Sequence, residues 1–163
     1  MLQEKAGIAV PYLEQLFTFS GKYRDPRGWS LSVAYFALVA EAALQGGAFE
    51  VIAVDKLARI PLLAFDHNRI VEMAVRRLRG KATYSALLAY LLPAQFTLPQ
   101  LQKVYETVMG VKLSKATFRR KVEAQGIVSL VRGKVQRGSP IPAQLYRLSV
   151  RLKDFVPGAA QMR

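Results

Sequence analysis

Arg119, Arg120 and Lys121 are three consecutive cations, and such a group can bind a polyanion. An arginine side chain can hold a phosphate or the edge of a guanine base through two parallel hydrogen bonds. At about 100° per residue, a helix would place Arg120 nearly opposite Phe118, on the side that a core around Phe118 leaves exposed. The spacing therefore indicates a helix that packs through Phe118 and presents cations to a partner.

Start and stop signals for a helix surround these cations. Ser114 has the position of an N-cap, and Gly126 has the position of a helix stop. A second helix is predicted just before, because Thr97 and Gln100 have the spacing of a capping box and an apolar stripe follows as far as Gly110. Two helices joined by the short connection GVKL are typical of a helix-turn-helix.

A basic β-hairpin is predicted after the second helix. Residues 127–148 read as a short strand, a loop with glycine, proline and basic residues, and a returning strand. This order of elements is that of a winged helix-turn-helix, in which the hairpin, or wing, meets the phosphate backbone. The residues expected to contact DNA are Ser114, Lys115, Thr117, Arg119, Arg120, Lys121, Arg132, Lys134 and Arg137.

The positive charge of the chain is concentrated in its C-terminal part. The 163 residues carry a net charge of +13. Residues 1–96 hold 11 Lys and Arg against 8 Asp and Glu, while residues 97–163 hold 13 against 3. This asymmetry indicates a basic C-terminal module that faces nucleic acid or an anionic membrane, and a solvated basic surface without a partner is the alternative. Together with the winged helix, it favours double-stranded DNA as the partner. RNA or another polyanion is one alternative, and a winged helix that contacts only protein is another.

Composition disfavours several kinds of chemistry. The chain has no cysteine, which excludes disulfides and thiolate metal sites. A single histidine, His67, disfavours a Ser-His-Asp triad or a multi-histidine metal centre. No apolar run reaches the roughly 18 residues that a membrane span needs. We therefore expect a cytoplasmic protein with no membrane partner, no metal and no cofactor.

The N-terminal part is predicted to consist mainly of strands. Aromatic, β-branched and other apolar runs predict strands at 12–19, 29–40 and 49–54. The segment 20–28 contains Gly, Asp-Pro and Gly, which predicts a loop between the first two strands.

Two helices are predicted between these strands and the helix-turn-helix. Asp66 has the position of an N-cap for a helix that Gly80 would stop. Thr83 would cap a short apolar helix that Pro93 ends.

Six segments spread over nearly the whole chain carry a resemblance to a known family. They are YLEQLFTF, RDPRGWSLSVAYFALV, LLAFDHNRIV, RLRGKATY, FTLPQLQKVYETVMGVKLSKATFRRKVEAQGIV and PAQLYRL. Together they resemble the Nudix-related transcriptional regulators of the NrtR type. The resemblance implies an α+β fold, with a partial Nudix-like α/β half at 1–80, a winged helix-turn-helix DNA-binding domain at 81–153 and a tail at 154–163.

The resemblance also implies a function and partners. Regulators of this type repress genes of NAD metabolism or of sugar and nucleotide utilisation, and they bind palindromic operators as homodimers. They sense a NAD-derived nucleotide such as ADP-ribose. Arg24, Asp25 and Arg27 are the candidates here for contact with such a phosphorylated effector.

The N-terminus departs from the Nudix pattern. The segment LQEKAGI at 2–8 matches only the tail of the Nudix signature, with Lys5 in place of a glutamate, and the rest of the Nudix box is absent. Nudix hydrolysis needs several carboxylates to hold Mg²⁺ against a diphosphate, and Glu4 alone does not supply them. We therefore expect that the chain is not an enzyme. The alternative function is that of a Nudix hydrolase of an ADP-ribose-type substrate, or of a fragment of one. Because strands without their Nudix partners expose pairing edges, we expect a second subunit to complete the sheet.

Overall fold

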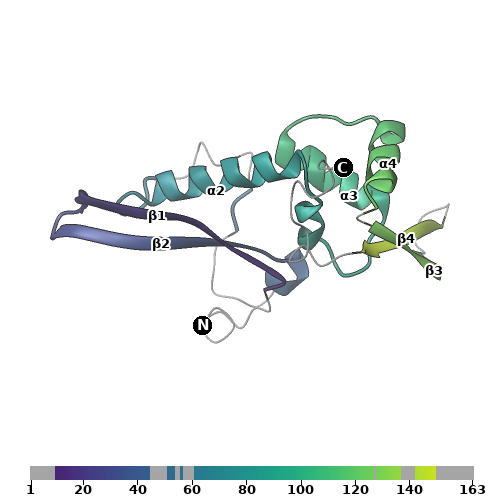
Figure 1. Cartoon of the computed structure of the whole chain (residues 1–163), viewed down its shortest axis with the longest axis horizontal. Coiled ribbons are helices and arrows are strands. Elements are labelled where there is room, and N and C mark those ends of the chain that lie inside the picture. Colours follow the sequence, from purple (N-terminus) through teal and green to yellow (C-terminus); the bar gives the residue numbers. More distant parts are fainter. Residues whose placement is uncertain are drawn as a thin grey trace, which may run out of the picture.

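The computed structural model describes residues 10–44, 51–53, 56, 61–126, 128–136 and 142–149. The molecule is elongated (Figure 1). A long β-hairpin with a helix alongside it forms one end, and shorter helical elements with a second, smaller hairpin form the other. Helices and strands are both present, as the predicted α+β class requires.

The long hairpin consists of β1 (Tyr12–Asp25) and β2 (Gly28–Leu38), which pair antiparallel. The loop predicted over 20–28 is wrong in its extent, because β1 continues through Asp25. The Asp25 carboxylate accepts a hydrogen bond from the backbone N–H of Arg27 at 2.9 Å, and Gly28 takes a φ of 134°. Because of this hydrogen bond and this glycine conformation, a turn of only two residues, Pro26 and Arg27, reverses the chain.

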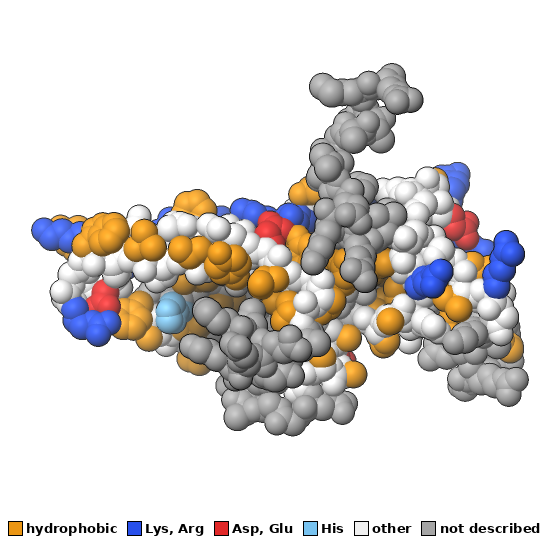
Figure 2. Space-filling model, turned by 60° about the horizontal axis from the view of Figure 1, so that its bottom comes forward, with side chains coloured by type: hydrophobic (Ala, Val, Ile, Leu, Met, Phe, Trp, Pro, Cys, Tyr) orange, Lys and Arg blue, Asp and Glu red, His pale blue; other side chains and the backbone are white. Residues whose placement is uncertain are grey.

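The outer face of the hairpin is apolar and exposed. Leu31, Val33 and Tyr35 alternate along β2, and each is about half exposed. Successive side chains of a strand point to opposite faces, so these three lie on one face. Figure 2 shows hydrophobic side chains along much of this end of the molecule.

Helix α2 (His67–Ala82) lies along β1 and is joined to it by ion pairs (Figure 1). Arg24 of β1 donates two hydrogen bonds to the Asp66 carboxylate, at 2.6 and 2.9 Å. Glu14 of β1 accepts from Arg77 at 3.0 Å and also pairs with Lys81. Asp66 does precede the helix as predicted, but its side chain makes no capping bond because it holds Arg24.

The predicted end of α2 is wrong by three residues, because the helix was expected to end at Arg79. Gly80 lies inside the helix, which continues to Ala82, and Thr83 is its C-cap. The Thr83 hydroxyl donates to the carbonyl of Gly80 at 2.7 Å, so this residue ends one helix and does not begin the next. The following element is a short 3₁₀ helix, η3 (Leu87–Leu91), which ends before Pro93 as predicted.

The third predicted strand is not found where the structure describes its residues. Val51, Ile52 and Ala53 have no regular structure, and the rest of 49–54 lies outside the described residues. Val51 is 70% exposed and Ile52 is 39% exposed, so the described part of this apolar run has no covering layer. The short 3₁₀ helix η1 (Glu41–Leu44) follows β2.

The opposite end of the molecule contains two apolar clusters, and the larger one joins the helices of this end. Helices α3 (Leu98–Met109) and α4 (Lys115–Ala124) contribute Leu98, Leu101, Phe118 and Val122, which pack with Phe96 and Tyr146. The capping box predicted at Thr97 and Gln100 is confirmed, with both of its hydrogen bonds formed. Gly110 ends α3 in the left-handed conformation, as predicted.

The second hairpin consists of β3 (Val128–Gln136) and β4 (Ala143–Leu148), again antiparallel. Phe96 and Tyr146 exchange two backbone hydrogen bonds, of 2.9 and 2.7 Å, so the segment before α3 pairs with the outer side of β4. This bridge fixes the hairpin against the start of α3. Within the described residues, no helix has the length and apolar character that crossing a bilayer demands.

Candidate nucleic-acid interface

Helix α4 is held by its inner face and leaves its other faces open. Phe118 is 8% exposed and Val122 is 5% exposed, and the Phe118 ring meets the Tyr105 ring edge-on at 5.4 Å. Ser114 precedes the helix in an extended conformation, as predicted for an N-cap, although its side chain makes no capping bond. Every other residue of α4 is exposed, so the packing of Phe118 and Val122 decides which side of the helix a partner can reach.

A network of hydrogen bonds fixes the turn between α3 and α4. The Gln102 amide donates to the carbonyl of Leu113 at 2.9 Å and to Glu106 at 3.0 Å. The Glu106 carboxylate accepts from the backbone N–H of Leu113 at 2.9 Å and lies 3.7 Å from the Lys112 ammonium. The backbone hydrogen bond from Leu113, with the Gln102 bond, holds the pKa of Glu106 below its ordinary value. We call Gln102 and Glu106 the turn clamp.

Sequence analysis missed the turn clamp. Its only signal was a Gln and a Glu four residues apart on the polar side of α3, directly before the glycine stop. On an exposed helix this spacing usually stabilises the helix itself. Here both side chains reach forward to one backbone residue of the turn, a contact that only the three-dimensional path of the chain reveals.

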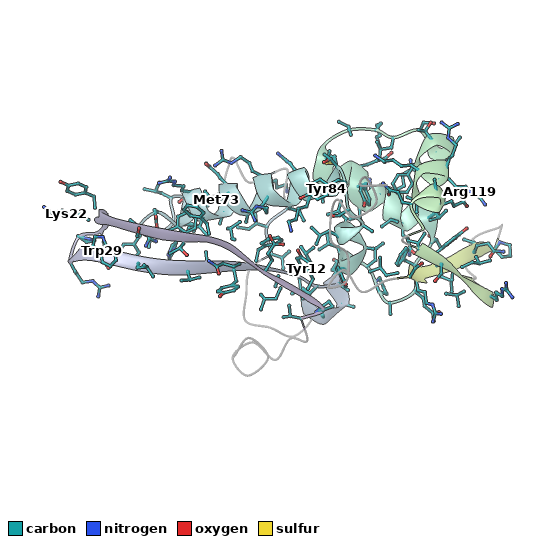
Figure 3. All side chains as sticks on the ribbon, viewed as in Figure 1. Tyr12, Lys22, Trp29, Met73, Tyr84 and Arg119 are labelled. Atoms are coloured by element: carbon teal, nitrogen blue, oxygen red, sulfur yellow. The ribbon has the colours of Figure 1, made fainter. Side chains whose placement is uncertain are left out.

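The cations of α4 differ in whether an acid neutralises them. The Arg119 guanidinium donates to Glu123 one turn later at 2.9 Å, which raises the pKa of Arg119. Among the described residues, Lys115, Arg120 and Lys121 have no acidic group within ion-pair distance. Figure 3 shows Arg119 projecting from α4 away from the rest of the fold. The open face of the helix thus carries one neutralised arginine and three free cations.

The wing carries its predicted cations on an irregular part of β3. The pairing with β4 shifts between Leu130 and Val135, and Gly133 takes a φ of 72°, so Arg132 and Lys134 lie in a bulge and not in a simple loop as predicted. Arg132 is exposed. The side chain of Lys134 and all of Arg137 lie outside the described residues.

Arg147 of β4 is a further exposed cation of the wing that sequence analysis missed. It pairs across the hairpin with Ser129, next to the buried Tyr146. The alternation of AQLYRL, with Tyr146 inward, places Arg147 outward and could have identified it.

The three candidate effector residues lie at the far end of the long hairpin and are engaged with protein groups. Arg24 holds Asp66 and also donates to the carbonyl of Phe19 at 2.8 Å. Asp25 accepts from the Arg27 guanidinium, and these bonds lower the pKa of Asp25 to about 2. The three residues are close in sequence, but Arg24 turns towards α2 while Arg27 stays with Asp25 in the exposed turn.

The described residues contain no group of three or more His, Asp or Glu side chains that could hold a metal ion. His67 packs its ring edge-on against Phe65 at 5.9 Å, at the start of α2. The carboxylates of Glu14, Asp25 and Asp66 each hold a cation of the protein.

Comparison with known proteins identifies the winged helix directly. Residues 88–148 match the family model described as the NrtR DNA-binding winged helix domain. The chain is 40% identical over 159 residues to the ADPR responsive transcriptional repressor NtrR of Acinetobacter baylyi. That alignment covers 94% of this chain and 63% of the repressor, so the chain spans less than two thirds of this relative's length.

Solved structures agree with the sequence comparison. The fold matches Shewanella oneidensis NrtR with a TM-score of 0.78 at 37% identity, covering 90% of this chain and 68% of that one. The same protein complexed with a 27mer DNA matches with a TM-score of 0.79 at 36% identity, over the same shares. A MutT/nudix family protein from Enterococcus faecalis matches with a TM-score of 0.68 at 22% identity, which supports a Nudix-related fold.

The hairpin with its flanking helix, the winged helix and these similarities in sequence and structure lead to one assignment. This chain belongs to the NrtR family of Nudix-related regulators.

Proposed function

We propose that the chain is a DNA-binding transcriptional repressor in which α4 enters the major groove of double-stranded DNA. One observation carries the proposal: Arg120 and Lys121 lie on the open side of a helix whose inner side is fixed by Phe118 and the turn clamp. Cations without acidic partners keep their full attraction for phosphate and base edges. The Shewanella oneidensis relative was crystallised with DNA, which supports the same partner here.

The roles of the residues follow from their positions. Residues at the start and on the open face of α4 would read bases or hold nearby phosphates, and the wing would hold the backbone. The proposed α4 set is Ser114, Lys115, Thr117, Arg119, Arg120 and Lys121. The proposed wing set is Arg132, Lys134 and Arg137.

The proposal extends to organisation and partners. We assign DNA binding to residues 81–153, a Nudix-like part to 1–80 and a tail to 154–163. A homodimer would place two copies of α4 on the two halves of a palindromic operator. A NAD-derived nucleotide such as ADP-ribose is the proposed effector, because the Acinetobacter baylyi relative is an ADPR responsive repressor. Arg24, Asp25 and Arg27 remain the proposed contacts, and the cytoplasm is the proposed location.

We infer that the chain does not hydrolyse ADP-ribose. The Acinetobacter baylyi relative is a transcriptional repressor by name, and the carboxylates of Glu14, Asp25 and Asp66 are held in ion pairs with Arg and Lys. Incubation with ADP-ribose and Mg²⁺ should release no ribose 5-phosphate. Release that a Glu4→Gln variant abolishes would instead support the hydrolase.

A salt titration tests DNA binding. A duplex selected from a random library would be labelled, and its affinity measured by fluorescence anisotropy between about 50 and 200 mM salt. The logarithm of the association constant should fall steeply and linearly with the logarithm of the salt concentration. Lys134→Ala should reduce this slope by about one unit, and it should weaken binding to all DNA sequences by the same factor. Failure to enrich any sequence, together with a flat slope, would overturn the proposal.

A further inference from the structure

A cavity of about 410 Å³ opens between the end of α2, the side of α3 and the side of α4. Its volume lies in the usual range for small-molecule sites, roughly 300–1,000 Å³. Two segments of the chain line it: 82–85, at the end of α2 and just after it, and 105–125, from α3 through the turn into α4. The cavity adjoins the open face of α4: Lys121 of that face lines the cavity, whereas Arg120 does not.

The floor of the cavity is apolar. It is formed by Tyr105, Met109, Phe118 and Val122, of which Phe118 and Val122 are buried core residues. The Tyr105 hydroxyl is already committed, because it donates to the carbonyl of Ser85 at 2.6 Å, and burial raises its pKa to about 12. Tyr105 therefore presents a neutral ring to the cavity, which suits a flat apolar group.

The rim of the cavity is cationic. Lys112 and Lys121 line it, together with the hydroxyl residues Ser114 and Thr117. No carboxylate is among the residues that line it, within the part of the chain that the structure describes. Lys112 lies near Glu106, at 3.7 Å, whereas Lys121 has no acidic partner among the described residues. An apolar floor below a free ammonium matches a small molecule with an aromatic or aliphatic body and one negative charge.

We propose that this cavity binds a small apolar anion, and that the bound anion competes with DNA phosphate for Lys121. The second half rests on the proposed function, because Ser114, Thr117 and Lys121 belong both to the cavity and to the proposed DNA-contacting set. Occupancy would therefore weaken DNA binding from a position outside the Nudix-like part of the chain.

The binding test needs no DNA. The chain contains four methionines, and Met109 lines the cavity while Met73 lies midway along α2 (Figure 3). In protein labelled with ¹³C at the methionine methyl groups, naphthalene-2-sulfonate should shift the Met109 resonance saturably and leave that of Met73 unchanged. For a probe of about 14 non-hydrogen atoms the expected dissociation constant is on the order of 1 mM. A Met109 signal that does not move, or moves without saturation, would overturn the proposal.

Charge recognition is tested by a matched pair of variants and a neutral probe. Lys121→Ala should weaken sulfonate binding by about threefold, the effect of losing one exposed charge contact. Lys115→Ala removes an exposed lysine of the same helix that does not line the cavity, and it should leave sulfonate binding unchanged. Naphthalene-2-sulfonamide, which is neutral, should bind wild type and Lys121→Ala equally. If the sulfonamide binds wild type as tightly as the sulfonate does, the cavity is an apolar gap without anion preference and the proposal fails.

Competition is then measured on the selected duplex. Compared with the same concentration of sodium chloride, saturating sulfonate should weaken DNA binding by wild type by about threefold, and it should have no further effect on DNA binding by Lys121→Ala. Unchanged affinity for DNA in wild type would overturn the competition. If no duplex binds at all, the proposed function fails, while the Met109 titration still decides whether the cavity binds an anion.

Discussion

At the hairpin end of the molecule Arg24, Arg27 and Arg77 each hold a carboxylate, whereas at the winged-helix end Arg120 and Lys121 have no acidic partner among the described residues. Apolar groups differ in the opposite way. Side chains of β2 are exposed along one whole face of the hairpin, while the apolar side chains of α3 and α4 pack into two clusters.

The same residue types therefore have different roles at the two ends of the molecule. Cations at the hairpin end join β1 to α2, so their charge contributes to the fold. Apart from Arg119, which pairs with Glu123, the cations of α4 make no ion pair among the described residues, and their charge is left for a partner. Conversely, aromatic residues of the winged helix stabilise the fold, and those on the outer face of the hairpin do not.

The largest expected effect concerns the two kinds of aromatic residue. Phe118→Ala should lower the free energy of unfolding by about 3–5 kcal/mol, because it opens a cavity in the winged-helix core. Tyr35→Ala, at a half-exposed position on the outer face of β2, should cost about 1 kcal/mol or less. Urea denaturation followed by circular dichroism measures both. Equal losses would show that the hairpin face is buried in solution.

The second expected effect concerns the two kinds of arginine. Arg120→Ala should weaken binding to the selected duplex by about 1–3 kcal/mol and relax its sequence preference, if this side chain holds a guanine edge. Arg27→Ala removes an exposed arginine that Asp25 neutralises, and it should leave DNA binding unchanged. Anisotropy on the selected and a scrambled duplex measures both. Equal effects of the two variants would show that the basic end binds polyanions without sequence preference.

The third effect is a pH dependence produced by the turn clamp. The pKa of Glu106 is lower in the folded state than its ordinary value of 4.5, so its carboxylate stabilises the fold above that pH. This contribution is lost as the pH falls through the folded pKa. Wild type should therefore lose more stability than Glu106→Gln between pH 7 and pH 3. Thermal unfolding at a series of pH values tests this, and parallel curves would show that the charge of Glu106 has no role.

The smallest expected effect sharpens the distinction between neutralised and free cations on α4 itself. Glu123→Gln releases Arg119 and should strengthen binding to any duplex by about twofold at low salt. Glu72→Gln on α2 removes the same charge from an exposed position at the other end and is the matched control. An equal gain in both variants would mean that net charge alone controls the affinity.

Sequence reasoning succeeded where the determinants are local. The Thr97 capping box, the left-handed glycines after α3 and α4, and the inward Phe118 are all set by residues within one or two helical turns. For this reason the winged helix could be predicted almost element by element.

The same reasoning failed where residues distant in sequence decide the outcome. Asp66 was expected to cap α2, but Arg24, 42 positions earlier, takes its carboxylate. Gly80 was expected to end α2, but tertiary contacts carry the helix past it, including the bond from Arg79 to the carbonyl of Val108. Sequence reasoning missed the turn clamp and the cavity for a related reason, because each forms only when the folded chain brings its residues together.

The backbone bridge between Phe96 and Tyr146 has a consequence for how the winged helix folds. The two residues lie about fifty positions apart, so the helix-turn-helix between them must be closed into a loop before the bridge can form. Contacts of such large sequence separation slow folding, whereas α3 and α4 can form from local contacts within microseconds. Because both bridge amides are protected by the same event, the N–H groups of Phe96 and Tyr146 should exchange with solvent deuterium at matching rates, despite belonging to opposite ends of the winged helix.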